Sequence, residues 1–192
     1  MRVKIQTGRF GELTVGLEDE IVVPQGLLGF PECKRFCLVD PADDTLILWL
    51  QSLDHSEVAF PLLEPKIFKP DYTARLSAAE LRELKLENIN QSAVFSVLTI
   101  PEDALQMSAN LKAPLVINLR ERIARQVVLQ ENEYTIKHPM FKELRAHVLT
   151  LQSQRRIAGS EGRSDGLAPA TPAAPVSIKN IPPSLTVKTL QA

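Results

Sequence analysis

Cysteine and histidine are scarce in this chain of 192 residues, which contains two cysteines and three histidines. Cys33 and Cys37 have three residues between them, a spacing that fits neither the usual zinc-binding pairs nor the C-x-x-C motif of thioredoxin-type enzymes. His55, His138 and His147 are scattered singly and supply no second ligand pair. We therefore expect two ordinary thiols at the ends of a strand, and no metal, redox centre or other cofactor.

Long hydrophobic runs are also missing. No apolar stretch approaches the roughly 20 residues that a membrane-spanning helix needs, and the N-terminal stretch MRVKIQT lacks the apolar segment of a signal peptide. The expected location is therefore the cytoplasm. Hydrophobic residues still make up 44% of the chain, so one domain with an appendage can fold without disulfides or metals.

Sequence motifs of enzymes are absent as well. The chain contains no G-x-S-x-G, Walker, G-x-G-x-x-G or H-E-x-x-H motif. Asp54 and Ser56 flank His55, but neighbours on an extended segment point to opposite sides and cannot form a catalytic triad. Asp43 and Asp44 fit a solvated turn better than paired catalytic carboxylates. We expect a protein that is not an enzyme and has no catalytic residue, with a small β-barrel enzyme of unrecognised site as an alternative.

Charge is unevenly distributed, although its sum is only −1. Residues 1–139 hold 15 basic and 20 acidic residues, a net −5, whereas residues 140–192 hold 7 basic and 3 acidic residues, a net +4. An acidic body favours a basic partner and disfavours direct nucleic-acid binding. Arg120, Arg122 and Arg125 cluster in the sequence, but few aromatic residues lie nearby to stack bases, so an RNA-binding module is the other alternative.

Short apolar runs fill residues 1–139, and most of them are bounded by proline, glycine or aspartate. Strands of this length, rich in valine, isoleucine, leucine and phenylalanine, predict an antiparallel sandwich or barrel. The expected fold class is mainly β: a small antiparallel β-barrel-like domain with one or two short helices. The expected strands are residues 3–5, 13–15, 21–23, 36–39, 46–51, 58–63, 94–99, 115–119 and 125–129.

One helix is expected to interrupt the strands. Ser77 and Glu80 have the spacing of a capping box, in which each side chain accepts a hydrogen bond from the other residue's backbone N–H. Leu81 and Leu84 follow on one face, and Asn88 is the expected end of the helix. A shorter helical turn is expected after Pro101.

The pattern changes after residue 139. Apolar residues recur at helical spacing, so residues 140–157 are expected to form an amphipathic helix. The stripe consists of Phe141, Leu144, Val148 and Leu151. We expect it to pack on the domain, with binding to a partner or to a second copy of the chain as alternatives. Residues 158–192 are rich in proline and alanine and are expected to form a disordered tail. The expected organisation is thus a β-rich domain (1–139), this helix and the tail.

Several segments, taken in order, resemble the family of the flagellar assembly factor FliW. They are GRFGE (8–12), VPQGLLGF (23–30), WLQSLD (49–54), DY (71–72), VLTIPED (97–103), MSANLKAP (107–114) and RQVVL (125–129), followed by Tyr134 and the pair at 138–139. Glu64 departs from the Asp-Pro pair common in the family. The resemblance covers residues 1–139, and the extension at 140–192 is longer than the typical family ending.

The resemblance implies a compact β-barrel-like fold and two protein partners. Members of this family bind flagellin before its export, and they bind CsrA, a small basic repressor of translation. A protein of this kind couples the synthesis of flagellin to its secretion. We expect this chain to bind both partners, to be a monomer when free, and to contact neither nucleic acid nor membrane.

A candidate partner-binding site follows from the turn residues of these segments. Asp71, Tyr72, Asn110, Ala113 and Pro114 lie on expected turns, where binding residues are often placed on a rigid scaffold. A role in supporting the fold is the alternative. If these residues border a partner site, replacing Tyr72 or Asn110 with alanine should weaken binding and leave the melting curve nearly unchanged.

Overall fold

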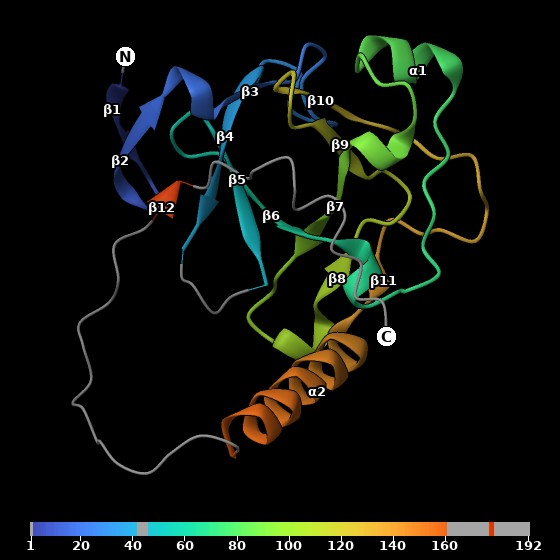
Figure 1. Cartoon of the computed structure of the whole chain (residues 1–192). Coiled ribbons are helices and arrows are strands. Elements are labelled where there is room, and N and C mark those ends of the chain that lie inside the picture. Colours follow the sequence, from blue (N-terminus) through green and yellow to red (C-terminus); the bar gives the residue numbers. More distant parts are fainter. Residues whose placement is uncertain (1, 42–45, 161–176, 179–192) are drawn as a thin grey trace.

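Figure 1 shows the computed structural model of the chain, which describes residues 2–41, 46–160 and 177–178. Asp43 and Asp44, and nearly all of the segment 158–192 expected to be disordered, lie outside the described residues. The described strands are β1 (Arg2–Thr7), β2 (Gly11–Gly16), β3 (Glu20–Val22), β4 (Arg35–Asp40), β5 (Leu48–Ser52), β6 (Ala59–Leu63), β7 (Ala93–Thr99), β8 (Ser108–Ala109), β9 (Leu115–Asn118), β10 (Ile123–Gln126), β11 (His138–Pro139) and β12 (Ser177–Ile178).

Most of the strands join in one sheet that closes on itself. The described sheet runs β11-β8-β7-β6-β5-β4-β3-β10-β9, β12 pairs with β4, and β7 also pairs with β9, so β3–β7, β9 and β10 form a barrel. Neighbouring strands are antiparallel except β3 and β10, which pair in parallel through Val22 and Ile123. Closure leaves few free strand edges within the barrel. The prediction of a mainly β, barrel-like domain is confirmed.

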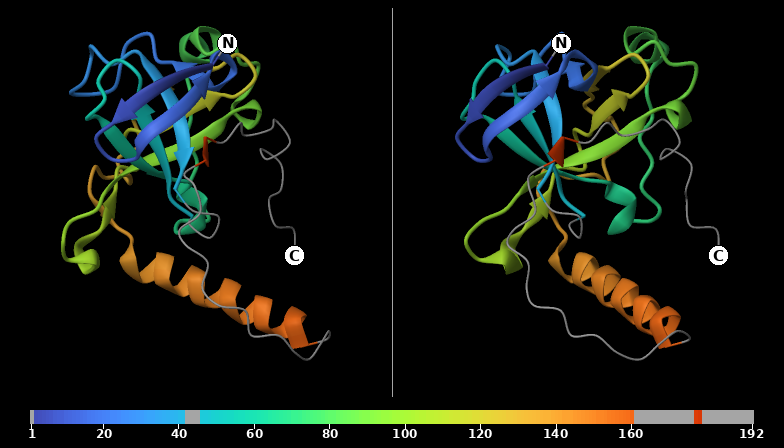
Figure 2. Two further views of the ribbon diagram at one scale, coloured as in Figure 1. Left: turned by 90° about the vertical axis from the view of Figure 1, so that its left-hand side faces the viewer. Right: turned by 60° about the vertical axis from the view of Figure 1, so that its left-hand side comes forward.

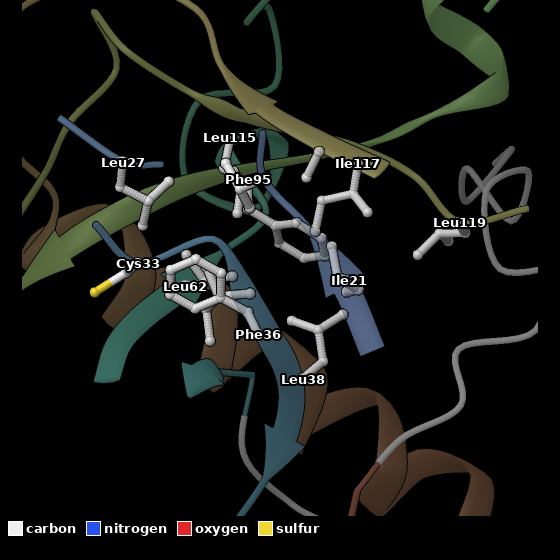
Figure 3. Packing of buried hydrophobic residues seen from close by; sticks show 13 residues of the cluster. Ile21, Leu27, Cys33, Phe36, Leu38, Leu62, Phe95, Leu115, Ile117 and Leu119 are labelled. Carbon is white, nitrogen blue, oxygen red and sulfur yellow. The ribbon is translucent and has the colours of Figure 1, made fainter. Parts of the chain in front are cut away.

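Two apolar layers lie on opposite faces of this sheet. The inner layer fills the barrel (Figure 3) and contains Ile21, Val23, Leu27, Cys33, Phe36, Leu38, Leu50, Leu62, Phe95, Leu115, Ile117, Leu119 and Ala124. An outer layer includes Leu63, Phe68, Tyr72, Leu84, Leu111, Val116, Val127, Leu129, Tyr134 and Met140. Side chains along a strand alternate between the two faces. Strand residues on both faces are therefore buried where segments outside the barrel cover it.

The β1–β2 hairpin covers another part of the barrel surface (Figure 2) and buries a third apolar cluster there. Leu13 and Val15 of β2 pack against Cys37, Val39 and Trp49. Cys37 therefore lies inside β4, whereas the sequence pattern had placed the two thiols at the ends of a strand. Both thiols are free and buried.

The strand expected at residues 125–129 is confirmed only in its first two residues. The ladder of β10 begins earlier, at Ile123, and ends at Gln126. Val127 and Leu129 then donate backbone hydrogen bonds to the carbonyls of Pro114 and Lys112 at 2.9 Å each. Because these acceptors belong to a loop, the chain continues alongside its neighbour without regular pairing.

The helix α1 (Ala78–Glu83) begins as expected. Ser77 Oγ accepts the Glu80 backbone N–H at 3.3 Å, and Glu80 Oε2 accepts the Ser77 backbone N–H at 2.7 Å. These reciprocal bonds form the capping box that the sequence indicates.

The end of α1 differs from the expectation, because the helix stops well before Asn88. Lys85 adopts a φ of 53°, and Leu86 N–H donates back to the Leu81 carbonyl at 2.8 Å. This is a Schellman ending, which usually has glycine in the left-handed position. Asn118, at the end of β9, donates its side-chain amide to the carbonyls of Leu84 and Lys85 at 2.9 and 3.2 Å. A tertiary contact therefore supports the ending.

Four short 3-10 turns complete the domain within the described residues: η1 (Leu17–Asp19), η2 (Pro65–Ile67), η3 (Ile89–Gln91) and η4 (Ala104–Gln106). The expected helical turn after Pro101 corresponds to η4. Asp103 caps it by accepting the Leu105 N–H at 3.0 Å. Asn88 caps η3 instead of ending α1.

The C-terminal helix α2 (Phe141–Ser160) occupies the region expected to be helical. Met140 is fully buried and Leu144 packs against the outer layer, so the start of the helix contacts the domain. Farther along, the helix runs away from the barrel (Figures 1 and 2), and Leu149 is 53% exposed. The expected packing on the domain therefore holds for the first turn of α2. Among the described residues, no helix combines the length and the hydropathy that crossing a membrane requires.

Candidate partner-binding site

Tyr72 anchors the region that contains the candidate residues. Its side chain is buried, and its hydroxyl donates a hydrogen bond to the Leu111 carbonyl at 2.9 Å. The ring lies against that of Tyr134, with 4.7 Å between the centroids. Burial raises the pKa of Tyr72, so the hydroxyl stays protonated and remains a donor. The hydrogen bond joins two of the turns that the sequence pattern singled out.

A third segment completes this region. The hydroxyl of Tyr134 accepts the Thr73 backbone N–H at 3.0 Å, and the Thr135 carbonyl accepts the backbone N–H groups of Leu111 and Lys112 at 3.0 and 3.2 Å. These bonds connect residues 69–75, 110–114 and 131–136, which together we call the three-segment face.

Asp71 is the most exposed of the candidate residues, with 78% of its side chain accessible. The Lys69 ammonium group lies 3.0 Å from its carboxylate and lowers the pKa of Asp71 through a hydrogen bond. Asp71 is therefore ionised, and its exposed carboxylate is shared with Lys69.

Asn110 is half-buried and holds its own turn together. Its Oδ1 accepts the Ala113 backbone N–H at 2.9 Å. The carbonyl of Ala113 accepts the Gln126 side-chain amide at 3.0 Å, and that of Pro114 accepts the Val127 N–H at 2.9 Å. Ala113 and Pro114 are both buried, so they fix the loop within the fold.

The structure thus brings the five candidate residues together, but it exposes few of them. Only the side chains of Asp71 and Asn110 offer polar atoms at the surface, whereas Tyr72, Ala113 and Pro114 are buried. A direct contact between a partner and these three side chains does not fit their burial. The burial of Tyr72 also disagrees with the expectation that Tyr72→Ala leaves the melting curve nearly unchanged.

The segment 131–136 adds surface residues that the sequence pattern did not indicate. Ile136 is 65% exposed and Glu133 is exposed. Glu131 approaches Arg75, with 3.9 Å between the guanidinium and the carboxylate, and its carbonyl accepts the Lys112 ammonium at 2.7 Å. The only signal for this segment was Tyr134 in the family pattern, because no motif indicates that a loop will pack beside two distant turns.

The residues considered for RNA binding and for catalysis make contacts that do not favour either function. Among the arginines considered for RNA, Arg125 forms an ion pair with Glu83, which neutralises part of the local charge. Asp54, next to His55, accepts the backbone N–H groups of Lys34 and Arg35 at 2.7 and 2.8 Å. Its carboxylate is therefore committed to the fold and does not orient His55 as a triad would require.

Known proteins provide a direct comparison. The family model described as FliW protein matches residues 4–140. A protein named flagellar assembly factor FliW from Bdellovibrio bacteriovorus is 40% identical over 167 residues, which is 87% of this chain and 93% of that protein. A protein of the same name from Thermoanaerobacter pseudethanolicus is 34% identical over 144 residues, covering 74% of this chain and 96% of its own.

A solved structure agrees in fold as well as in sequence. The crystal structure of the flagellar assembly factor FliW aligns with a TM-score of 0.68 and 32% identity, over 72% of this chain and 97% of its own. The Bdellovibrio match of 167 residues is too long to fit within residues 1–139. It therefore extends over the residues that form α2 in this chain. By sequence and by structure, the chain belongs to the FliW family.

Proposed function

We propose that this chain is a cytoplasmic flagellar assembly factor that binds flagellin and a CsrA-type translational repressor. The observation that carries the proposal is the 40% identity, across most of both chains, to a protein named flagellar assembly factor FliW. The two partners come from the family resemblance. In this proposal, flagellin and the repressor both bind the free form of this protein, so binding of one leaves less for the other. Binding requires neither a catalytic residue nor a cofactor.

The charge of the domain supports a basic partner. Residues 1–139, which we propose as the binding domain, have a net charge of −5. Opposite charge on a partner speeds association and disfavours wrong partners. A small basic repressor fits this requirement, and the association should weaken as salt screens the charges.

The three-segment face supports binding through protein surfaces. Hydrogen bonds between its segments hold the exposed Asp71 and Ile136 and the half-buried Asn110 on a fixed scaffold. A surface that is already ordered loses little conformational entropy when a partner binds. We propose this face as one partner site, with Tyr72, Ala113 and Pro114 supporting it from within.

Isothermal titration calorimetry with each purified partner should detect both complexes. The full chain is titrated with monomeric flagellin and, separately, with the CsrA-type repressor of the same organism. We expect saturable binding of each partner, and weaker binding of the repressor at higher salt. The absence of heat and of co-elution with either partner at tens of micromolar would contradict the proposed function.

Replacing Asp71 with asparagine tests the site itself. This change removes one exposed charge from the three-segment face, and we expect about a 5–10-fold weaker affinity for at least one partner. Glu12→Gln is a matched control, since Glu12 also pairs with one lysine, Lys4, at 2.8 Å on the exposed β1–β2 hairpin. The melting temperatures of both variants should match that of the wild type. Equal affinities of the two variants for both partners would place the partner sites elsewhere.

A further inference from the structure

We propose that Glu32, Cys33 and His55 form a binding site for a late first-row divalent cation, with Zn²⁺ the best match. One ligand atom of each residue, namely a carboxylate oxygen, the thiol sulfur and an imidazole nitrogen, lies within 4.8 Å of the other two. Glu32 and Cys33 precede β4, and His55 follows β5. The fold therefore unites residues that are 22 positions apart in the chain.

The three donor atoms are those that zinc uses in proteins. Zinc binds thiolate, imidazole and carboxylate at about 2.0–2.3 Å in tetrahedral sites, which places the ligand atoms about 3–4 Å apart. Glu32 and His55 are exposed, so their side chains can rotate through the small remaining distance. Three protein ligands leave the fourth position to water, the pattern of an open zinc site.

Cys33 is suited to the role of the fixed ligand. Its residue is fully buried, but its sulfur points away from the neighbouring apolar side chains of the inner layer (Figure 3). Burial raises the pKa of Cys33, and the Ser52 hydroxyl near the sulfur partly offsets this effect. A cysteine that binds a metal does so as the thiolate, so its proton passes to solvent when the metal–sulfur bond forms.

Ser52 connects the cysteine to the histidine. Its Oγ accepts the backbone N–H groups of Asp54 and His55 at 3.2 and 3.1 Å. The same hydroxyl can donate its hydrogen to the sulfur of Cys33. Outer partners of this kind orient metal ligands.

Asp54 holds the two loops at a fixed separation. Its carboxylate accepts the backbone N–H groups of Lys34 and Arg35, and Leu53 N–H donates to the Arg35 carbonyl at 2.8 Å. The backbones of Cys33 and His55 are thus positioned before any cation arrives, and ligand binding requires adjustment only of exposed side chains.

A cobalt titration of the tag-free, reduced full chain tests the site. Co²⁺ is a spectroscopic substitute for Zn²⁺, and a cobalt–thiolate bond produces a charge-transfer band in the near ultraviolet. We expect this band to grow to one equivalent and to disappear when Zn²⁺ is added. Cys37, the other thiol, is fully buried against Leu13 and Val15 of the β1–β2 hairpin and lies outside the proposed ligand group, so it should not contribute.

Single variants assign the ligands. His55→Gln and Cys33→Ala should weaken cobalt binding by more than the 10–100-fold typical of losing an outer partner, and Glu32→Gln should weaken it less severely. His147→Gln, on α2, is the matched histidine control and should bind as the wild type does. Because His55 is exposed, His55→Gln should fold normally, which keeps the test valid if Cys33→Ala does not.

Thermal unfolding supplies a second measurement. A cation that binds only the folded chain should raise the melting temperature by about 5–10 °C at a zinc concentration about 100-fold above its Kd. The rise should vanish in His55→Gln and persist in His147→Gln. A wild type without the thiolate band, or a His55→Gln variant that binds cobalt as tightly as the wild type, would overturn the proposal.

Discussion

Tyr72→Ala should lower the free energy of unfolding by about 3–5 kcal/mol, the usual range for truncating a buried aromatic side chain. Tyr72 is 2% exposed and fills the space between Tyr134 and the loop at Leu111. Removing it leaves a cavity in the outer layer and an unpaired Leu111 carbonyl. For a domain of this size, we expect the melting temperature to fall by about 2–4 °C for each kcal/mol.

Tyr72→Phe separates the hydrogen bond from the packing. The ring remains, so the expected loss is about 1–3 kcal/mol, because the buried Leu111 carbonyl loses its partner. Urea denaturation of both variants provides the comparison. If Tyr72→Ala unfolds within about 1 kcal/mol of the wild type, the buried anchor described for the three-segment face is wrong. Tyr72→Phe also tests how far the face depends on this bond, since its affinity for partners can be measured while the protein stays folded.

Gly26→Ala should also destabilise the domain strongly, by about 2–5 kcal/mol. Gly26 has a φ of +69°, a conformation that disfavours every residue with a Cβ. A Cβ at this position would lie 2.5 Å from the Phe30 carbonyl oxygen and 2.7 Å from the Pro31 Cα. Both are backbone atoms, so the turn must open to admit the methyl group. That movement would shift Phe30, whose ring contacts Phe60 at 5.0 Å between centroids.

Gly11→Ala is the matched control for this effect. Gly11 has nearly the same φ, +66°, but no described atom lies within 4 Å of its added Cβ. It should therefore lose only the conformational contribution of about 1–2 kcal/mol. Thermal denaturation of the two variants distinguishes crowding from backbone preference. If both variants lose the same free energy of unfolding, the close approach at Gly26 adds no destabilisation to the backbone preference.

Local patterns were sufficient to predict most of the secondary structure. The apolar runs located the barrel strands β4–β7 and β9, because strand residues that bury a side chain are recognisable by composition and by their turn boundaries. The capping box of α1 was equally local, since its donors and acceptors lie three residues apart. Where these predictions failed, a distant residue was involved: α1 ends early at Lys85, where Asn118 binds the last carbonyls.

Barrel closure and the candidate sites depended on contacts between distant segments. The parallel pairing of β3 with β10 and the pairing of β7 with β9 have no signature in either strand alone. The same is true of His55 beside Cys33, because a single histidine and a single cysteine carry no spacing pattern when the chain brings them together from separate loops.

The residue pattern alone predicted that the chain is mainly β, where most of its elements lie, and which family its segments resemble. Each of these depends on the order and periodicity of residues along the chain. Which candidate residues reach the surface became evident from the folded chain. Asp71 and Tyr72 are neighbours on one turn, yet one is exposed and the other is buried under Tyr134. Burial depends on what packs against a residue from elsewhere in the chain, and the adjacent residues in the sequence do not indicate which segment that will be.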